Sequence, residues 1–578
     1  MNVKTIQLIR KIALLNALQH GGSANFNSVM GKVIAERHDL KIKINEVIPI
    51  IKKITREVNS LSISEQRRHV EEKWPALLIK EKAKPEIKKL PPLPNIENYS
   101  IVHVRFCPNP DGSLHLGGSR AAILCDEYAE MYSGHFTLRF DDSDPRTKAP
   151  ILEAYNWIRE DLRWLDIKWH KEIYQSDRLD IYYHYTNLLI EMGKAYVCSC
   201  NPQKFKRLLL LGQRCPCRNL NSKEHLERWN KMLNGSYKEG QAVVRIKTDL
   251  NHPNPAVRDW PALRIIDVNK FPHPRTGDKY RVWPLFAFCS GVDDHDLEIS
   301  HILRGKEHLT NSTRQHFLYA YLGWNYPEAI HYGRFKMTGT VLSKSKIREG
   351  IDNNTYCGWD DPRLGTLRAL RRRGFRPETI RHLILEVGPK AVDVTVSWKN
   401  LQAYNRKIVE HIANRYSFVS NPVQLMVKNI NRPYICKLPL HPSYRERGYK
   451  SITITPVDDK AIFFISNNDI KFFEKGKIVR LMGLFNVTGI KVDETIEAAF
   501  HSESYQEAKS IKAPLIHWLP STTGVKTAVI MPDASIIKGL SENDCRNLNE
   551  GDIIQFERFG FVRIDNVVDK LITYYAHR

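Results

Sequence analysis

The alternation of apolar and polar residues predicts helices at the start of the chain. Between Ile6 and Leu18 apolar residues recur at helical spacing, and a second helical pattern runs from Val47 to Val58. The stretch from Lys80 to Pro94 is rich in Lys and Pro, a composition typical of a linker. Residues 1–95 are therefore predicted to form a helical appendage followed by a linker.

Strand and helix patterns alternate between residues 96 and 349. The apolar segment Ile101–Phe106 has strand character, and it leads through a turn into a helix expected to begin around Ser119. The alternation stops between about 181 and 275 and resumes from Arg281 to Leu342. We predict a doubly wound, Rossmann-type α/β domain that contains an inserted domain.

The remainder of the chain changes character once more. Residues 350–415 have helical patterns, whereas residues 416–578 contain short strands separated by turns, such as Ser451–Ile454 and Val525–Met531. Short strands at this spacing favour barrels. The predicted fold is therefore multidomain: an N-terminal helical domain, a Rossmann-type domain with its insertion, a helical connecting domain and C-terminal all-β barrels.

The composition of the chain is strongly basic. The chain has 578 residues, of which 42% are hydrophobic, and a formal net charge of +23. Such a basic balance indicates a polyanionic partner, although a merely well-solvated basic surface is the alternative, and charge alone does not separate tRNA from DNA. The sequence has no apolar run near the ~18 residues of a membrane span and no secretory signal pattern, so we expect a cytoplasmic protein without membrane contact.

The turn after Phe106 contains the most informative chemistry. It runs through Cys107-Pro108-Asn109-Pro110 and reaches His115-Leu116-Gly117-Gly118 at the start of the predicted helix. A strand followed by a Gly-rich turn and a helix N-terminus is the outline of a nucleotide-phosphate site. Glycine lets the backbone approach the phosphates closely, and an imidazole can donate a hydrogen bond to them.

This run resembles the first signature of class I aminoacyl-tRNA synthetases. Met337–Lys346 is similar to the lysine loop that forms their second signature. The segments Arg139–Pro145, His301–Leu309 and Gly358–Leu370 narrow the resemblance to glutamyl-tRNA synthetase of the archaeal type, a close relative of glutaminyl-tRNA synthetase. The resemblance extends over almost the whole chain. It implies ATP-dependent activation of glutamate and its transfer to the 3′ end of tRNA(Glu), with tRNA(Gln) as a second candidate and a monomeric enzyme.

The resemblance also implies roles for individual residues. His115 and Lys344 are the expected catalytic residues, with backbone N–H groups near Gly117-Gly118 assisting and Mg²⁺ accompanying ATP. The expected ATP contacts are Pro108, His115, Gly117, Gly118, Ser343, Lys344 and Ser345. The expected glutamate contacts are Arg105, Asn109, Asp141, Phe286, Ser290 and Arg304. Arginine suits a carboxylate substrate because its fork makes paired hydrogen bonds, but a buried ion pair within the sheet is the structural alternative.

The sequence departs from the family in the amino-acid pocket. Trp283-Pro284-Leu285-Phe286-Ala287-Phe288 stands where the family has Tyr-Pro-x-Tyr-Asp-Phe. Phe286 lacks a hydroxyl that would touch the amino acid, and a lost hydrogen bond costs about 1 kcal/mol. Two alternatives therefore stay open: a glutaminyl-tRNA synthetase, which two pocket arginines disfavour, and a catalytically impaired paralogue that binds RNA.

Four cysteines form two closely spaced pairs within the predicted insertion. Cys198 and Cys200 precede Cys215 and Cys217 in C-x-C pairs that are tighter than the usual zinc-ligand spacing. Four thiolates can complete a tetrahedral zinc site, and a similar site occurs at this place in some members of the resembled family. We therefore expect structural Zn²⁺, with reduced, metal-free cysteines as the alternative. The resemblance further implies that the insertion holds the acceptor end of tRNA and that the barrels read its anticodon.

Overall fold

The computed structural model describes residues 3–19, 22–41, 44–74, 90–492 and 496–578. The chain divides into two compact units, Met1–Ile87 and Lys88–Arg578. Residues 80–89 of the predicted linker lie outside the described residues.

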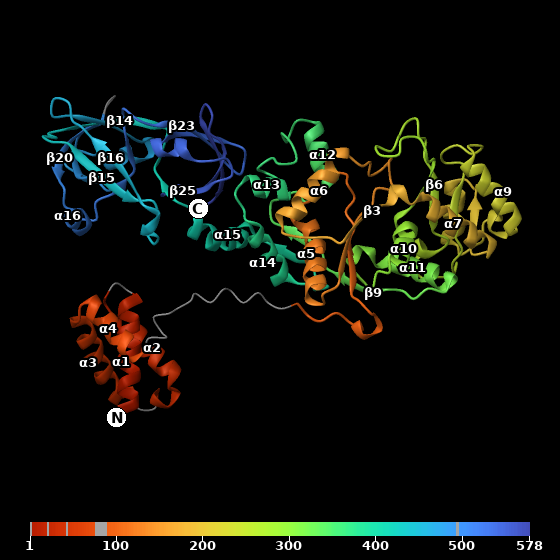
Figure 1. Ribbon diagram of the computed structural model, residues 1–578, viewed down its shortest axis with the longest axis horizontal. Coiled ribbons are helices and arrows are strands. Elements are labelled where there is room, and N and C mark those ends of the chain that lie inside the picture. The colour runs from red at the N-terminus through yellow and green to blue at the C-terminus, as the bar shows by residue number, and fades with distance from the viewer. Residues whose placement is uncertain (1–2, 20–21, 42–43, 75–89, 493–495) are drawn as a thin grey trace. The chain divides into compact units, whose positions relative to one another are not determined.

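Helices build the first unit, as predicted (red in Figure 1). Their bounds are α1 Val3–Gln19, α2 Phe26–Glu36, α3 Ile44–Ser60 and α4 Ile63–Lys73. Val47, Ile51, Ile54 and Val58 of α3 recur every three or four residues and are buried, which gives the helix one apolar face. At the start of α4 the Ser62 side chain accepts from the Glu65 N–H, and the Glu65 carboxylate accepts in return from the Ser62 N–H. This capping box fixes where the helix begins.

A parallel sheet forms the centre of the second unit. Strands β1 (His103–Phe106), β2 (His135–Phe140) and β3 (Lys171–Tyr174) lie in that order, with α5 (Leu116–Met131) and α6 (Leu152–Trp164) as crossovers. A second parallel pair, β8 (His301–Gly305) with β9 (Glu328–Tyr332), continues beside β1, where the Ser300 N–H donates to the His103 carbonyl at 3.0 Å. Helices α10 (Phe286–Asp296) and α11 (Leu309–Leu322) precede and follow β8. The predicted doubly wound α/β arrangement is confirmed.

Helix α5 begins three residues earlier than expected. It starts at Leu116 rather than around Ser119, because His115 occupies the N-cap position and its side chain accepts from the Gly118 N–H. A histidine side chain thus replaces the Ser, Thr, Asp or Asn that usually caps a helix. The first turn of α5 contains both glycines of the predicted phosphate motif.

The inserted domain has its own antiparallel sheet. Its strands follow the order β4 (Ala195–Cys198), β5 (Val243–Ile246), β6 (Pro261–Ile265) and β7 (Val282–Pro284), and the helices around them are α7 (Leu179–Glu191), α8 (Pro202–Leu210) and α9 (Ser222–Leu233). Strand β7 pairs with β6, although the sequence analysis assigned this segment to the resumed parallel sheet. The reason is that Leu263 and Ile265 of β6 are buried and pair with β7, so the strand completes the core of the insertion.

Helices and a short parallel pair of strands follow the parallel sheet. Their bounds are β10 Phe335–Met337, α12 Lys344–Asp352, α13 Leu367–Arg372, α14 Pro377–Val387, β11 Val394–Val396 and α15 Trp398–Ile412. Strand β10 pairs in parallel with β11, which brings the segment before the lysine loop against the helical region.

The last part of the chain is all-β apart from short helices, as predicted (blue in Figure 1). Two seven-stranded sheets, in the orders β12-β25-β26-β27-β23-β24-β13 and β21-β18-β19-β20-β14-β17-β22, form near-closed barrels. The strands of the first sheet are β12 Arg415–Tyr416, β13 Phe418–Ser420, β23 Val525–Ile530, β24 Ile536–Ser541, β25 Ile553–Phe556, β26 Gly560–Asn566 and β27 Leu571–His577. Those of the second sheet are β14 Pro422–Lys428, β17 Ala461–Ser466, β18 Ile478–Leu481, β19 Asn486–Val492, β20 Ile496–Ser502, β21 Leu515–Ile516 and β22 Trp518–Pro520. The hairpin β15 (Tyr434–Pro439) and β16 (Tyr449–Ile454) and helix α16 (Tyr505–Ser510) complete the region.

Candidate active site

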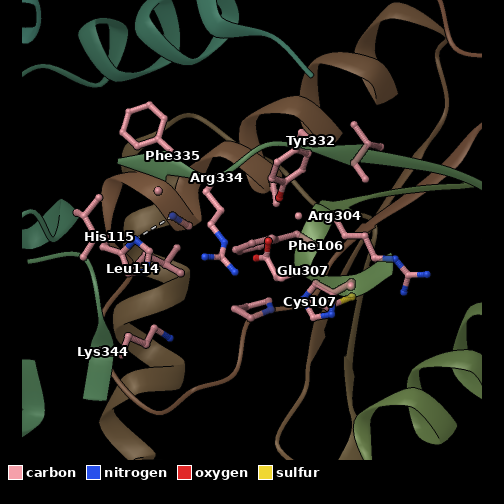
Figure 2. A pocket seen from close by; sticks show the side chains of 18 of the residues that line it. Phe106, Cys107, Leu114, His115, Arg304, Glu307, Tyr332, Arg334, Phe335 and Lys344 are labelled. Atoms are coloured by element: carbon pink, nitrogen blue, oxygen red, sulfur yellow. Dashed lines mark hydrogen bonds between the residues drawn. The ribbon is translucent and has the colours of Figure 1, made fainter. Parts of the chain in front are cut away.

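The turn between β1 and α5 fixes the imidazole of His115. Its Nδ1 accepts from the Gly118 N–H at 3.0 Å, so the neutral ring carries its proton on Nε2 (Figure 2). Burial, together with the nearby charge of Lys344, lowers the pKa of His115 to about 4. His115 is therefore neutral near pH 7 and has Nε2–H as its hydrogen-bond donor. The Gly118 N–H, by contrast, is already used within this cap.

Lys344 lies at the first position of α12 and reaches back to the same turn. Its Nζ donates to the Asn109 carbonyl at 2.7 Å and forms an ion pair with Asp111 Oδ1 at 3.0 Å. Burial lowers the pKa of Lys344, while the Asp111 carboxylate opposes that shift. The Arg348 side chain donates to the Asp111 carbonyl, which ties the next turn of α12 to the same loop. The two signatures, more than 200 residues apart, are thus in direct contact.

A cavity of about 430 Å³ gathers most of the predicted site residues. Its lining includes Arg105, Pro108, His115, Gly117, Gly118, Phe286, Ser290, Arg304 and Lys344. Asn109 and Ser345 line a neighbouring cavity, which Lys344 also borders, whereas Asp141 and Ser343 line neither of the two. The structure therefore brings residues of both signatures and four of the six predicted amino-acid contacts, Arg105, Phe286, Ser290 and Arg304, to one cavity.

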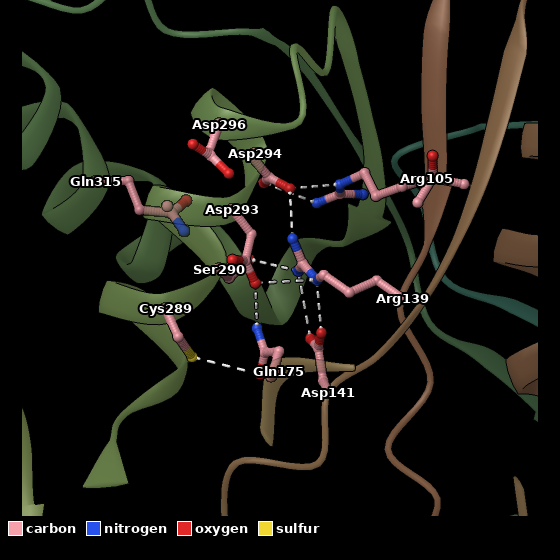
Figure 3. A network of polar contacts seen from close by, with 12 residues as sticks. Arg105, Arg139, Asp141, Gln175, Cys289, Ser290, Asp293, Asp294, Asp296 and Gln315 are labelled. Carbon is pink, nitrogen blue, oxygen red and sulfur yellow. Dashed lines mark hydrogen bonds and ion pairs between the residues drawn. The ribbon is translucent and has the colours of Figure 1, made fainter. Parts of the chain in front are cut away.

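Behind this cavity lies a buried network of arginines and aspartates (Figure 3). Arg105 makes a paired contact with Asp294 at 3.0 and 3.2 Å, and Arg139 contacts Asp141 at 2.8 Å and Asp294 at 2.9 Å. The Arg139 guanidinium also lies 3.6 Å from Asp293 and donates to Ser290 Oγ at 3.1 Å. Arg105 and Asp141 thus take part in buried ion pairs. Such ion pairs were the structural alternative to substrate binding that the sequence left open.

Burial and ion pairing oppose each other in this network. Burial raises the pKa of Asp141 to about 6, although Arg139 acts in the opposite direction. Burial acts on Asp294 in the same way, but two arginines face it, and the pKa of Asp294 is lowered overall. Asp294 is therefore ionised at every pH of interest, whereas Asp141 can change its charge near neutrality.

Arg304 differs from the arginines of the network. It lies on β8, is buried, and lines the cavity, yet its Nη1 has no hydrogen-bond partner among the described residues. Burial lowers the pKa of Arg304, although a guanidinium remains charged at neutral pH. A buried cationic donor without a partner is costly, so the site is suited to an anionic ligand at this position.

The altered pocket segment occupies the start of α10. The Phe286 ring lies against the His308 ring, with centroids 4.8 Å apart. Ala287 is buried, and its carbonyl accepts from Gln315 Nε2 at 3.3 Å. Of the two side chains that replace the tyrosine and aspartate of the family pattern, Phe286 lines the cavity beside His308, whereas Ala287 is buried behind it.

Several lining residues were missed by the sequence analysis. Glu307, His308, Arg334 and Lys336 line the cavity together with Arg139, and Figure 2 shows Glu307 and Arg334 extending toward its middle. Arg139 had a usable signal, because it lies two residues before Asp141 on a strand whose side chains alternate between faces. For the other four, no spacing in the sequence points to the cavity.

The four cysteines of the insertion converge. Cys198 Sγ lies 4.0 Å from Cys215 Sγ, and Cys200 Sγ lies 3.6 Å from Cys217 Sγ. The three sulfurs of Cys198, Cys200 and Cys215 lie within 4.8 Å of one another. Zn–S bonds of 2.3 Å in a tetrahedron place sulfurs ~3.8 Å apart, so these three sulfurs fit a zinc ion. Cys217 contacts Cys200 but lies outside the group of three.

No helix in the described part of the chain is long and apolar enough to cross a membrane.

Three family models match the chain. Residues 101–411 match the catalytic domain of tRNA synthetases class I (E and Q), and residues 413–503 and 515–565 match two anti-codon binding domains of the same group.

Full-length relatives agree with this assignment. A protein of Pyrococcus furiosus named glutamate–tRNA ligase is 53% identical over 99% of this chain and 99% of its own. Proteins of the same name from Pyrococcus abyssi and Sulfurisphaera tokodaii are 53% and 47% identical over 100% and 98% of both chains. The matched residues include both signatures and the whole cavity described above. The chain therefore belongs to the glutamyl and glutaminyl (E and Q) group of class I tRNA synthetases.

Proposed function

We propose that this protein is a glutamate–tRNA ligase. The observation that carries the proposal is the unpartnered Nη1 of Arg304, a buried cation in the same cavity as His115 and Lys344. A carboxylate side chain satisfies such a donor, whereas a neutral amide leaves the charge uncompensated. Relatives at about half identity over the whole chain have the same name, and the glutaminyl alternative is not favoured.

In the first step, an oxygen of the glutamate α-carboxylate attacks the α-phosphorus of ATP, and pyrophosphate leaves. His115 donates from Nε2 to a phosphate oxygen, because its Nδ1 is already occupied by the Gly118 N–H. Lys344 exchanges Asp111 for the phosphates, where it offsets the charge that moves to the leaving pyrophosphate. When bound with ATP, Mg²⁺ supplies further neutralisation of the phosphates. In the second step, a ribose hydroxyl at the 3′ end of tRNA attacks the activated carbonyl and AMP leaves.

The amino acid occupies the Arg304 side of the cavity in this proposal. Arg304 binds the side-chain carboxylate, and Arg105, Ser290 and Phe286 form the surrounding wall. Asp141 takes the α-amino group, which requires its ionised form. Pro108, Gly117, Gly118, Ser343 and Ser345 are proposed to contact ATP together with His115 and Lys344. Asn109 stays a predicted glutamate contact, although it lines the neighbouring cavity.

We propose that Cys198, Cys200, Cys215 and Cys217 hold a structural zinc ion. The sulfur separations of 3.6 and 4.0 Å support this. The ion would tie the end of β4 to the loop after α8, and so shape the insertion that receives the acceptor end of tRNA.

The barrels are proposed to read the anticodon of tRNA(Glu). The matches to anti-codon binding domains and the strongly basic charge support tRNA as the partner. Charging of tRNA(Gln), a monomeric state and a cytoplasmic location stay predictions, as do the proposed domain boundaries at residues 95, 349 and 415.

An aminoacylation assay tests the function. Purified tRNA(Glu) and tRNA(Gln) are each incubated with glutamate or glutamine, ATP and Mg²⁺. We expect glutamate to be attached to tRNA(Glu) and glutamine to neither tRNA. Efficient charging with glutamine would favour the glutaminyl alternative, and no charging at all would favour the impaired paralogue.

A further inference from the structure

The guanidinium of Arg304 is held by neutral groups. Its Nε lies 3.4 Å from His331 Nε2. Its Nη2 donates to Ser312 Oγ at 2.6 Å, Gln315 Oε1 at 2.9 Å and the Tyr326 hydroxyl. Among the described residues, no carboxylate forms an ion pair with Arg304. Nη2 therefore has more acceptors than hydrogens, whereas Nη1 has none.

Two nearby arginines of the cavity wall are, unlike Arg304, paired with carboxylates. Arg105 and Arg139 each contact buried carboxylates, and these raise their pKa values despite burial. Burial lowers the pKa of Arg304, which has no such contact. The charge of Arg304 is thus left uncompensated at contact distance, and the cost of burying it is recovered only when an anion binds.

Gln315 is the side chain on which this difference depends. It is fully buried on α11, and its Oε1 accepts from both Arg304 Nη2 and the Tyr326 hydroxyl. Its Nε2 donates to the Ala287 carbonyl, so the amide nitrogen and the amide oxygen of Gln315 both have hydrogen-bond partners. A glutamate at this position would place a carboxylate oxygen where the amide oxygen lies, and would neutralise Arg304 from within the protein.

We propose that Gln315 is a positioning residue that determines the preference for glutamate over glutamine. By holding Arg304 through a neutral oxygen, it leaves the guanidinium charge available to the substrate side-chain carboxylate. The inference rests on the proposed function and deepens it. It predicts that one added negative charge behind Arg304, without any change in the cavity lining, weakens the preference.

The test compares Gln315→Glu with Gln315→Met in the full-length protein. Activation is measured as ATP–pyrophosphate exchange with glutamate or glutamine, in the presence of tRNA(Glu). For Q315E we expect the ratio of kcat/KM for glutamate to that for glutamine to fall at least roughly tenfold, mainly through a higher KM for glutamate. Q315M removes the acceptor but adds no charge, so it should weaken glutamate binding while the preference is retained. The KM for ATP should stay unchanged in both variants.

Two further variants serve as controls. Gln7→Glu makes the same chemical change at an exposed position of α1 in the first unit and should behave as the wild type. Ser312→Asp places a carboxylate against the same Arg304 nitrogen from a second position, and it should reproduce the loss of preference if Q315E fails to fold.

The outcomes separate the inference from the proposed function. If the wild type prefers glutamate but folded Q315E or S312D keeps that preference within about threefold, the role of Gln315 is wrong and the function stands. If Q315M loses the preference as completely as Q315E, Gln315 acts through shape rather than charge, which also overturns the inference. If the wild type itself activates glutamine as well as glutamate, the proposed function fails.

Discussion

At the residue scale, contacts within the protein set the charge and hydrogen-bonding state of His115 and Lys344 before any substrate binds. His115 is neutral because burial and Lys344 lower its pKa, and its cap to Gly118 decides which nitrogen can donate. Lys344 is paired with Asp111. A bound triphosphate must therefore replace the Asp111 carboxylate as the partner of Lys344. Because the lysine side chain is already held in one position, it loses little conformational freedom when ATP binds.

Substitution of Lys344 by alanine should slow formation of the adenylate by more than roughly tenfold, because the lost charge acts mainly in the transition state. The measurement is the single-turnover rate of activation, with ATP binding determined separately. Lys346→Ala, an exposed lysine of the same helix, is the control and should retain the wild-type rate. An unchanged rate in the Lys344 variant would remove this lysine from the mechanism.

Asp141 should make glutamate binding depend on pH. Its pKa is raised to about 6, so the carboxylate is ionised above that pH and becomes protonated below it. We expect the KM for glutamate to increase several-fold between pH 7.5 and pH 5.5, because a protonated carboxyl no longer attracts the α-ammonium group. His115, with its pKa at about 4, stays neutral over this range.

The Asp141→Asn variant is the control for this pH dependence. Its KM for glutamate should be high at pH 7.5 and nearly constant down to pH 5.5, since no carboxyl remains at this position. The KM for ATP is followed in parallel to detect titration of the nucleotide. A wild-type KM for glutamate that does not change over the range would contradict the assignment of Asp141.

At the element scale, short loops bring together functional side chains that lie far apart in the sequence. The turn after β1 and the start of α12 meet through Lys344, Asn109 and Asp111. In the insertion, the end of β4 and the loop after α8 meet through four cysteines. In the insertion, Phe205 and Tyr196 pack in the same buried cluster as the cysteines, so a metal ion would add to apolar packing that already joins these segments.

The cysteine cluster should bind one equivalent of zinc. Metal analysis of chelator-washed and then zinc-reconstituted protein measures this directly. Cys215→Ser should lose the metal and impair charging of tRNA more than binding of ATP, because the insertion lies outside the nucleotide cavity. Cys357→Ser, an exposed cysteine elsewhere, should keep the metal. A native protein without zinc and with all four thiols freely reactive would refute the site.

At the scale of the whole molecule, each of the two compact units contains its own buried core. The buried core of the first unit includes Ile9 of α1, Val33 of α2 and Ile51 of α3. Within the second unit, polar contacts join the barrels to the helical region. Arg373 donates to the Ala576 carbonyl at 3.1 Å in a buried contact, and Arg372 forms a partly buried ion pair with Asp565 at 2.9 Å. The last strand of the chain thus helps to complete the helical region that follows the catalytic sheet.

A chain that begins at Lys88 should therefore fold and activate glutamate nearly as well as the full protein. We expect the main unfolding transition to stay within about 2 °C of its original Tm, because no core of the second unit loses a residue. Calorimetry and ATP–pyrophosphate exchange measure these two properties. A loss of more than about 5 °C would show that the first unit stabilises the catalytic unit directly.

The sequence by itself determined the elements and the identities of the reacting groups. The period of the apolar residues located α1 and α3 of the first unit and short strands such as β16 and β23, because burial of one face is a local property of the pattern. It did not locate α2 and α4, and β16 pairs with β15 in a separate hairpin rather than in a barrel sheet. The two signatures and the four cysteines could be recognised because their chemistry depends on residue type and short spacing. Even so, the start of α5 was misplaced, because a histidine acts as its cap.

Only the tertiary structure decided which charges are compensated. Arg105 and Arg304 look equivalent in the sequence, yet Asp294 neutralises Arg105, whereas Gln315, 11 residues after Arg304, leaves that arginine free for a ligand. Strand β7 likewise joined the insertion because its partner β6 lay there. The physical reason is the same in each case: ion pairing, desolvation and strand pairing depend on neighbours that are distant in the chain, and one sequence pattern can be surrounded by different neighbours.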